Sequence, residues 1–148
     1  MRIIFATDHA GFTLKEAVMA YVRDELGYDV EDCGAFSYDE SDDYPEYMRE
    51  AGERVAEAPD ECKAIIFGGS GTGEAIVANR IRGVRAAVYY GGNQDILTLS
   101  REHNDANVLS LGARFLEESE AKDAVKLWLQ TPFSEEERHV RRINKIDA

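Results

Sequence analysis

The sequence predicts an α/β fold, a three-layer sandwich in which a five-stranded parallel sheet lies between two layers of helices. Short runs of β-branched and apolar residues alternate along the chain with longer segments whose apolar residues recur at helical spacing. Strands that alternate with helices pair in parallel, and the helices cover both faces of the sheet. With 148 residues, the chain has the length of one domain with its own hydrophobic core.

Five strands and six helices follow from this alternation. The expected strands cover residues 2–7, 28–33, 63–68, 84–90 and 107–112. The expected helices cover residues 12–26, 43–58, 73–81, 93–104 and 119–131. Pro45 is compatible with the first turn of the second helix. A last helix follows Ser134, which is expected to form a capping box with Glu137 three residues later. The chain is thus expected to be one domain, 1–148, with residues 134–148 as a C-terminal helical arm.

Composition and charge exclude several classes of protein. Hydrophobic residues make up 44% and charged residues 31% of the chain, which is ordinary for a soluble globular protein. No stretch reaches the roughly 18 apolar residues that a membrane span needs, and the first residues lack the layout of a signal peptide. The net charge of −12 argues against binding to nucleic acid or to anionic membranes. Cys33 and Cys62 form no CxxC pair, which favours a reduced, cytoplasmic protein.

Polar residues and glycines follow several of the expected strands. Asp8 and His9 come directly after the first strand, a glycine-rich turn follows the third, and Gly112 to Arg114 follow the fifth. In open parallel sheets, sites lie at the carboxyl ends of the strands, near a reversal in strand order. We therefore expect these residues to meet at one edge of the sheet.

The glycine-rich turn opens the segment GGSGTGEAIVANR at 68–80 and has four glycines in six residues. Glycine lets a ligand approach the backbone N–H groups, and a helix that starts here adds the positive end of its dipole. The turn therefore predicts a site for a phosphate or for an oxyanion that forms during a reaction. It is not a P-loop, because Glu74 and Ala75 stand where that motif has Lys and Ser or Thr. A tight turn that needs glycine only for packing is the alternative.

Glu74 stands at the far end of this turn. A carboxylate beside an oxyanion-binding turn can remove the proton from the carbon next to a carbonyl, while the N–H groups hold the enediolate oxygen. A Glu at a helix N-terminus can also act only as a favourable partner of the helix dipole. The residue pattern by itself leaves both interpretations open.

Several segments together resemble ribose-5-phosphate isomerase type B and related sugar-phosphate isomerases. They are DHAGFTLK (8–15), DYP (43–45), GGSGTGEAIVANR (68–80), GVRAAV (83–88), SREHNDANVLSLGAR (100–114) and TPFSEEERHVRR (131–142). The segments match in order over nearly the whole chain. The resemblance implies a Rossmann-like aldose–ketose isomerase of the pentose phosphate pathway, with no cofactor and no metal. It also implies a homodimer, or a tetramer of dimers, with active sites shared between subunits.

The resemblance assigns catalytic roles to individual residues. Asp8 matches an aspartate after the first strand, and His103 matches the histidine assigned to opening the sugar ring. Ser70 and the amides of the glycine turn match the anion hole. Glu74 matches the proton-transfer base of one branch of the family, whereas the other branch has a cysteine at the position of Gly68.

The remaining matched residues are assigned to substrate binding. Arg114 and two arginines of the last helix match residues that hold the phosphate, and Tyr44 matches a tyrosine that lines the sugar site. Cys62 precedes the third strand and is expected to be structural. The expected substrate-binding residues are His9, Tyr44, Gly69, Gly71, Gly73, Asn104, Arg114, Arg138 and Arg142.

Each of these residues also has a structural explanation. His9 could be a hydrogen-bonded structural histidine, and Asp8 a turn residue. His103 could be a cation near a helix C-terminus, and the arginines of the last helix could form a solvated stripe on one helical face. Asp8, His9, Glu74 and His103 could also gather around a metal, but the chain has no local ligand motif such as HExxH.

The expected function is interconversion of ribose 5-phosphate and ribulose 5-phosphate by ring opening and proton transfer through a cis-enediolate. One alternative is an isomerase of a six-carbon sugar phosphate, such as allose or galactose 6-phosphate. Another is a non-catalytic sensor of sugar phosphates on the same fold. Glu74 beside the glycine turn, together with His103, favours an enzyme. The helical arm is expected to pack on a partner subunit and to carry Arg138 and Arg142 into the neighbouring active site.

Overall fold

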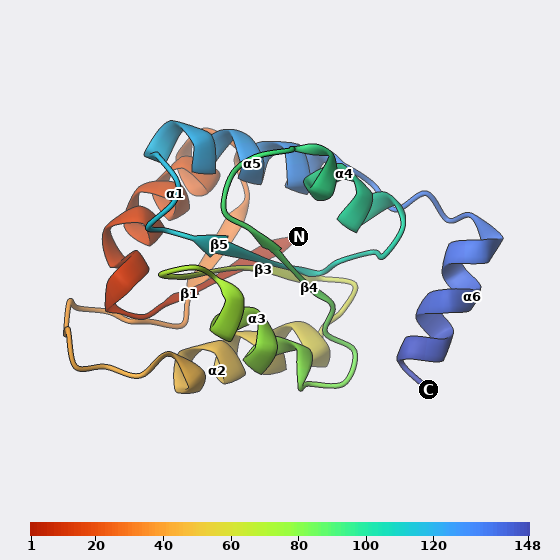
Figure 1. The fold of residues 1–148 in the computed structure, drawn as a ribbon, viewed down its shortest axis with the longest axis horizontal. Helices are drawn as coiled ribbons and strands as arrows, with labels where there is room; N and C mark the ends of the chain where they lie inside the picture. The colour runs from red at the N-terminus through yellow and green to blue at the C-terminus, as the bar shows by residue number, and fades with distance from the viewer.

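The computed structural model describes residues 1–148 and contains a five-stranded, all-parallel sheet (Figure 1). Its strands are β1 (Arg2–Thr7), β2 (Asp29–Asp32), β3 (Cys62–Gly68), β4 (Ala86–Tyr89) and β5 (Val108–Gly112). They lie in the order β2-β1-β3-β5-β4, so β2 and β4 are the edge strands. The expected five-stranded parallel sheet is confirmed.

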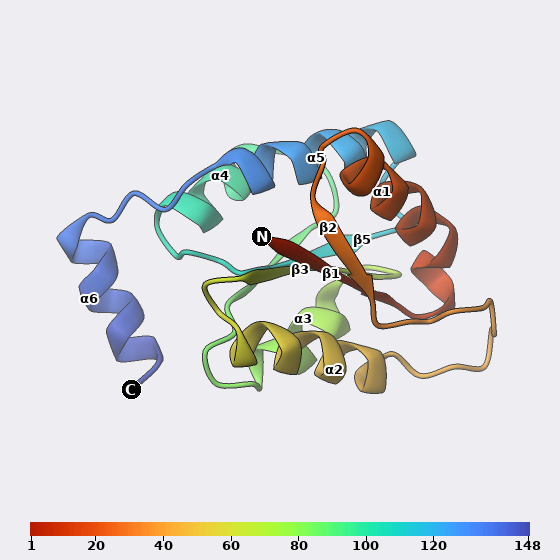
Figure 2. The same ribbon diagram turned by 180° about the vertical axis from the view of Figure 1, so that it is seen from behind.

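Helices cover both faces of the sheet. On one face lie α1 (Phe12–Asp24), α4 (Asp95–Glu102) and α5 (Glu118–Gln130), and on the other lie α2 (Tyr44–Glu57) and α3 (Thr72–Asn79) (Figures 1 and 2). A short 3-10 turn, η1 (His9–Gly11), links β1 to α1. The sixth helix, α6 (Glu137–Ile146), lies apart from both layers. None of the helices combines the length and the apolar character that crossing a membrane would need.

Successive side chains of the central strands point into different cores, as the two-residue period of a strand requires. In β1, Ile3 and Phe5 belong to the core under α1 and α5, whereas Ile4 and Ala6 belong to the core under α2. All four side chains are fully buried. A sheet packed on both faces is a rigid platform, so residues that follow its strands are held in fixed positions.

The strand order reverses between β1 and β3. From β1 the chain passes through α1 to β2 on one side, and from β3 it passes through α3 toward β4 on the other. The carboxyl ends of these strands lie side by side, with Thr7 paired to Phe67, and Gly68 is paired to Gly112 of β5. The diverging connections leave the edge above β1 and β3 open to a ligand.

The C-terminal arm lies at the end of the molecule opposite this edge (Figure 1). The segment before α6 is tied to α4, because the backbone N–H and the hydroxyl of Ser134 both donate to the carbonyl of Glu102, at 3.2 and 2.6 Å. The end of α6 is tied to the turn before β4. There Arg85 donates to the carboxylate of Asp147 at 3.0 Å and Arg82 donates to its carbonyl at 3.1 Å.

The capping box expected for Ser134 and Glu137 is wrong. α6 begins at Glu137, its N-cap residue is Glu136, and no side chain caps its first N–H groups. The Ser134 hydroxyl is used by the Glu102 carbonyl instead. A tertiary hydrogen bond to a free carbonyl at the end of α4 thus replaces the local cap that the spacing suggested.

Candidate active site

Residues from three strands meet at the open edge of the sheet. Asp8 and His9 follow β1, the glycine turn follows β3, and Arg114 follows β5. The turn and the last segment are bound together, since Ala113 N donates to Gly68 O at 2.8 Å and Arg114 N donates to Gly69 O at 3.1 Å. The structure therefore brings the sequence-predicted residues of these strands into one site.

The glycine turn is held in a shape that only glycine adopts easily. Gly71 has a φ of 81° and stands at the N-cap of α3, and its carbonyl accepts a hydrogen bond of 2.7 Å from the buried Ser110 hydroxyl. The Ser70 hydroxyl accepts from the Thr72 N–H at 3.3 Å. Backbone N–H groups at the start of a helix, beside an exposed hydroxyl, form a suitable site for an anion.

The side chain of Glu74 fills the space in front of Gly68. A Cβ atom built on Gly68 would overlap the Glu74 carboxylate, both of its oxygens included. The resemblance described above places a cysteine base at position 68 in another branch of that family. In this chain a carboxylate that comes from α3, six residues later, occupies the space into which a side chain at position 68 would point.

Glu74 is a buried carboxylate, with only 4% of its surface exposed. Burial raises its pKa, and the negative charge of Asp8 raises it further, while a hydrogen bond to the backbone N–H of Glu74 itself opposes the rise. A carboxylate with a raised pKa binds a proton more readily. Glu74 is therefore suited to take a proton from carbon and return it.

His9 is held by a residue that the sequence analysis missed. Asp42 Oδ1 accepts from the backbone N–H of His9 at 3.0 Å and lies 2.7 Å from its ring Nδ1. The hydrogen bond to Asp42 is the main cause of the raised pKa of His9, with smaller contributions from the charges of Asp8 and Asp42. His9 is thereby biased toward the cationic form, which suits an anionic ligand.

Two further residues close the site. The guanidinium of Arg114 lies beside Gly69, with Nη1 3.2 Å from the point where a Cβ of that glycine would be. The Tyr44 hydroxyl lies 2.5 Å from the corresponding point at Gly73. These glycines thus leave room for two side chains that frame the turn, as the assigned phosphate and sugar contacts would require.

Asp8, His9 and Asp42 offer ligand atoms within 4.8 Å of one another, the spacing of a possible cation site. Their atoms already serve the loops, however. Asp8 Oδ1 accepts from the Ala10 N–H at 3.0 Å, and Asp42 Oδ1 is shared by two groups of His9. The metal cluster considered from the sequence also needs Glu74 and His103, and the structure does not bring His103 to this edge.

His103 and the two arginines of α6 that were expected to bind substrate lie at the other end of the molecule. His103 is the C-cap of α4, and Asn104 leads from it toward the start of β5. From Val108 to Gly112, β5 advances by four residue steps, a rise of roughly 13 Å at ~3.3 Å per residue. The structure thus divides the predicted site residues between two clusters that one chain does not join. The second of these contains His103, Asn104, Arg138 and Arg142.

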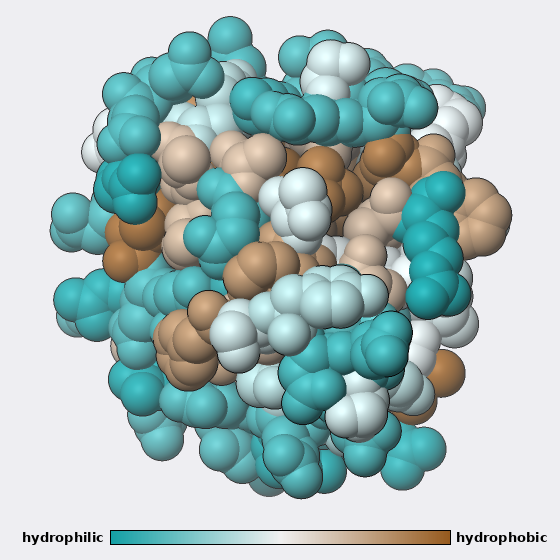
Figure 3. Space-filling model, turned by 90° about the vertical axis from the view of Figure 1, so that its left-hand side faces the viewer, coloured by the Kyte–Doolittle hydropathy of each residue, from teal (hydrophilic) through white to brown (hydrophobic).

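The carboxyl-end face also carries exposed aromatic side chains. Figure 3 views the molecule from the left of Figure 1 and shows apolar and weakly polar residues across the middle of this face, framed by hydrophilic ones. Four aromatic residues that follow strands are between 55% and 74% exposed, and two of their rings, Tyr90 and Phe115, lie 5.9 Å apart. They are Phe36, Tyr38, Tyr90 and Phe115.

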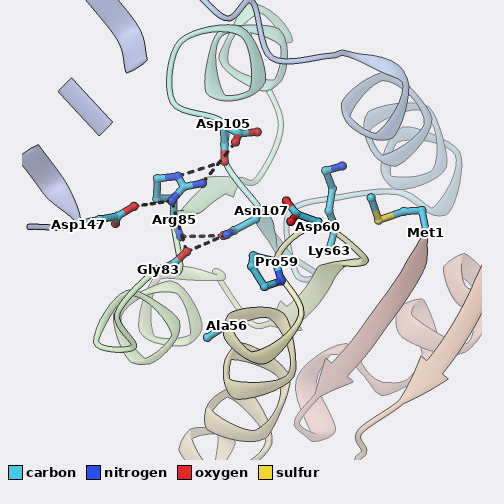
Figure 4. Close-up of a pocket in the computed structure, with 10 residues that line it drawn as sticks. All are labelled: Met1, Ala56, Pro59, Asp60, Lys63, Gly83, Arg85, Asp105, Asn107 and Asp147. Atoms are coloured by element: carbon cyan, nitrogen blue, oxygen red, sulfur yellow. Dashed lines mark hydrogen bonds and ion pairs between the residues drawn. The ribbon is translucent and has the colours of Figure 1, made fainter. Parts of the chain in front are cut away.

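The amino-end face contains a polar hollow that involves none of the sequence-predicted site residues. Figure 4 shows Arg85 on the side of the hollow next to Asp147, and this arginine bonds to Asp147, to Asp105 and to the carbonyl of Gly83. The amino group of Lys63 is also part of its lining, and burial lowers the pKa of that group. Since all the nitrogens of the Arg85 side chain already have partners, we assign this arginine to docking of the C-terminal arm.

The fold and the carboxyl-end cluster define an α/β protein that can bind an anion at a glycine turn and move a proton with a buried carboxylate. A family model described as Ribose/Galactose Isomerase matches residues 3–146. The chain belongs to this family, which confirms the resemblance drawn from its motifs.

Relatives match over nearly their whole length. Ribose-5-phosphate isomerase B of Mycolicibacterium paratuberculosis is 41% identical over 97% of this chain and 88% of its own. The protein of that name from Escherichia coli is 37% identical over 99% and 95%. The crystal structure of ribose-5-phosphate isomerase B from Mycoplasma genitalium, with bound ribulose-5-phosphate, has a TM-score of 0.92 at 34% identity. It covers 99% of this chain and 93% of that one.

The structure also identifies a buried lysine that the sequence analysis did not weigh. Lys15 is fully buried, and its Nζ donates to both carboxylate oxygens of Asp32 at 2.7 Å and to the carbonyl of Ala35 at 2.8 Å. These bonds hold the start of the loop that ends at Asp42. Lys15 is the last residue of the segment DHAGFTLK, and this position in a matched motif was the only sequence signal that it has a structural role.

Proposed function

We propose that the chain catalyses the interconversion of ribose 5-phosphate and ribulose 5-phosphate. The names of its relatives and the ribulose-5-phosphate bound to one of them support this substrate pair. Within this chain, the observation that carries the proposal is the buried Glu74 carboxylate between Gly68 and the anion-binding turn. Aldose–ketose isomerisation needs this pair of functions, a base at carbon and a holder for the enediolate oxygen.

Glu74 moves the proton between C2 and C1. In the direction of the ketose it removes the C2 proton of the open-chain aldose, and the electron pair moves to the carbonyl oxygen. The resulting cis-enediolate is stabilised by the Ser70 hydroxyl and the amides of the glycine turn. A proton passes from the C2 hydroxyl to the C1 oxygen, and Glu74 then returns its proton to C1 as the C2 carbonyl forms. Burial supports this cycle because it raises the pKa of Glu74.

The phosphate positions the substrate for this transfer. Arg114 and His9 lie at the same edge as Glu74, and the hydrogen bond to Asp42 favours the cationic form of His9. Arginine binds phosphate through its planar fork of N–H groups. Binding energy at the phosphate fixes C2 near the base, which lowers the entropic part of the barrier.

The remaining functional residues come from a second copy of the chain. Since His103, Asn104, Arg138 and Arg142 are distant from Glu74 within one chain, a homodimer is needed to complete the site. His103, with Asp8, opens the sugar ring by moving protons between the ring oxygen and the C1 hydroxyl. The arginines of α6 complete the phosphate clamp. The exposed aromatic residues of the carboxyl-end face supply apolar area for such contacts.

The test is the appearance of solvent hydrogen at carbon. Ribulose 5-phosphate in deuterium oxide should acquire deuterium at C1 in the presence of the enzyme, and Glu74→Gln should abolish this exchange. Turnover of ribose 5-phosphate should be compared with that of allose 6-phosphate and galactose 6-phosphate in the same assay. Binding of all these compounds without turnover or exchange would contradict the proposal. A cytoplasmic location and a role in the pentose phosphate pathway remain predictions.

A further inference from the structure

Two histidine rings connect the C-terminal arm to α4. His103 is the C-cap of α4 and His139 lies in the first turn of α6. Their ring centroids are 4.2 Å apart and the planes differ by 18°, so the rings are stacked. Such close, nearly parallel stacking restricts rotation of both rings.

His139 lies in surroundings that disfavour a charge. It is only 4% exposed, and its buried Nε2 has no hydrogen-bond partner. Protonation would place an N–H group at Nε2 without an acceptor, which is costly in a buried position. The neutral ring with its proton on Nδ1 avoids that cost.

The charged groups around His139 favour the same form. Burial is the main cause of its lowered pKa, followed by the neighbouring His103 and by Arg138, with a smaller effect of Arg142. Only Glu136 acts in the opposite direction. His103 is the C-cap of α4, and the other three groups belong to α6 or its N-cap.

We propose that His139 is a positioning residue for His103. Its neutral ring fixes the plane of the His103 imidazole and stays uncharged while His103 takes up and releases a proton. This inference rests on the proposed role of His103 in ring opening. It adds a residue that orients the acid–base group and does not itself contact the sugar.

Stacking on a neutral ring suits a histidine that alternates between two charge states. The face of an aromatic ring attracts a cation, so the protonated form of His103 is tolerated. A charged neighbour would repel that form instead. The helix that carries His139 is bonded at both ends, since Ser134 bonds to Glu102 before α6 and Arg85 bonds to Asp147 after it (Figure 4).

The experiment separates ring opening from proton transfer. Ribulose 5-phosphate has its C5 oxygen esterified and cannot close a furanose ring, so deuterium exchange at its C1 reports proton transfer alone. Turnover of ribose 5-phosphate, which is a closed ring in solution, reports both steps. The variants are His139→Ala, which removes the stacked ring, and His139→Phe, which keeps a neutral aromatic ring of similar size.

His139→Ala should lower kcat for ribose 5-phosphate about tenfold, since misplaced acid–base groups lose their advantage. Its exchange rate at C1 should stay within about twofold of wild type, and this also verifies that the protein is folded. His139→Phe should recover most of the lost turnover. A third variant, His139→Arg, puts a fixed positive charge beside His103. In this variant the acidic limb of the pH–rate profile for ribose 5-phosphate turnover should move to lower pH.

Equal losses of turnover and exchange in His139→Ala would overturn the inference, because they would indicate only that α6 is poorly docked. A rise in KM for both substrates with kcat unchanged would overturn it in the same way. His103→Asn in the same assays tests the underlying function. If His103→Asn loses turnover of ribose 5-phosphate but keeps exchange at C1, and His139→Ala shows no such selective loss, only the positioning role fails. If His103→Asn affects both assays equally, the ring-opening role fails, and the positioning role with it.

Discussion

The two ends of the sheet hold their functional residues in different ways. At the carboxyl end, Glu74 is buried and lies against the backbone of Gly68, and the turn around it is bonded to β5. At the amino end, His103 is held by one stacked ring, and α6 by a few bonds at its two ends. The rigid end suits carbon–hydrogen chemistry, which needs accurate geometry. The other end suits groups that, in the proposed homodimer, fit against a second subunit.

The largest effect is expected at the rigid end. Glu74→Gln keeps the size of the side chain and removes its basicity, so turnover should fall by at least ~100-fold, the usual cost of losing a general base. Binding of a sugar phosphate should remain largely intact, because the phosphate contacts are elsewhere in the site. Steady-state kinetics and calorimetric titration measure the two effects.

The control for this variant is Cys62→Ser. Cys62 is a buried, free cysteine at the start of β3. Replacing it with serine should leave kcat almost unchanged. Glu74→Gln with activity within about threefold of wild type would remove Glu74 as the base. A large loss of kcat in folded Cys62→Ser would indicate that the base had been assigned to the wrong residue.

A mixing experiment tests how the two ends combine. Glu74→Gln and the double variant Arg138→Ala/Arg142→Ala should each be nearly inactive as pure dimers. If the two clusters of one site come from different chains, a mixed dimer has one intact site and one doubly damaged site. After random exchange about half of the dimers are mixed, so activity should return to about a quarter of the wild-type value.

Subunit exchange has to be verified for this experiment, for example by mass spectrometry of isotopically labelled chains. A mixture of each variant with itself serves as the control and should stay inactive. Verified exchange without recovery of activity would mean that the arginines serve the site of their own chain.

A smaller loss is expected from Gly68→Ala, which tests the contact at the rigid end. The added methyl group overlaps the Glu74 carboxylate, so Glu74 must move. Displacing the base should lower kcat about tenfold or more, and overpacking should lower stability by ~1–3 kcal/mol. Enzyme kinetics and thermal unfolding measure these effects.

A double variant tests why Gly68→Ala lowers kcat. If Gly68→Ala acts by moving Glu74, then adding it to Glu74→Gln should reduce the residual activity little further. Independent losses that multiply would show that the methyl group obstructs the substrate directly.

The same contrast explains what the sequence could predict. The strands and the carboxyl-end residues were predictable because apolar runs mark buried parallel strands, and residues that follow such strands converge at one edge. The overlap of Glu74 with the space in front of Gly68 depends on the path of α3. The sequence placed the two residues in one motif without showing that their side-chain positions coincide.

Other features depend on tertiary contacts that have no periodic signal. Asp42 lies in the acidic loop DESDDYP, where the residue that bonds to His9 cannot be told from its neighbours. The stacking of His139 on His103 joins two segments that the whole of β5 and α5 separates in the sequence. The cap expected for Ser134 was wrong for the same reason, because the Glu102 carbonyl competes successfully for its hydroxyl.

The smallest effect is expected from Asp42→Asn, which alters only the charge beside His9. Asp42 raises the pKa of His9, so in the wild type His9 keeps its positive charge to higher pH than an ordinary histidine. The amide lacks the negative charge and is a weaker acceptor, so the pKa of His9 should fall toward its usual value. Since the cationic ring is proposed to bind the phosphate, KM should begin to rise at lower pH in the variant. At pH 6, where His9 is still largely protonated, the two proteins should differ little. Near pH 8 the variant should have a KM about threefold higher. The control is Asp39→Asn in the same loop, whose carboxylate bonds to Ser41 and interacts with His9 only through its charge, so it should change the pH dependence of KM much less. A uniform rise in KM at every pH would mean that Asp42 shapes the loop and does not set the charge of His9.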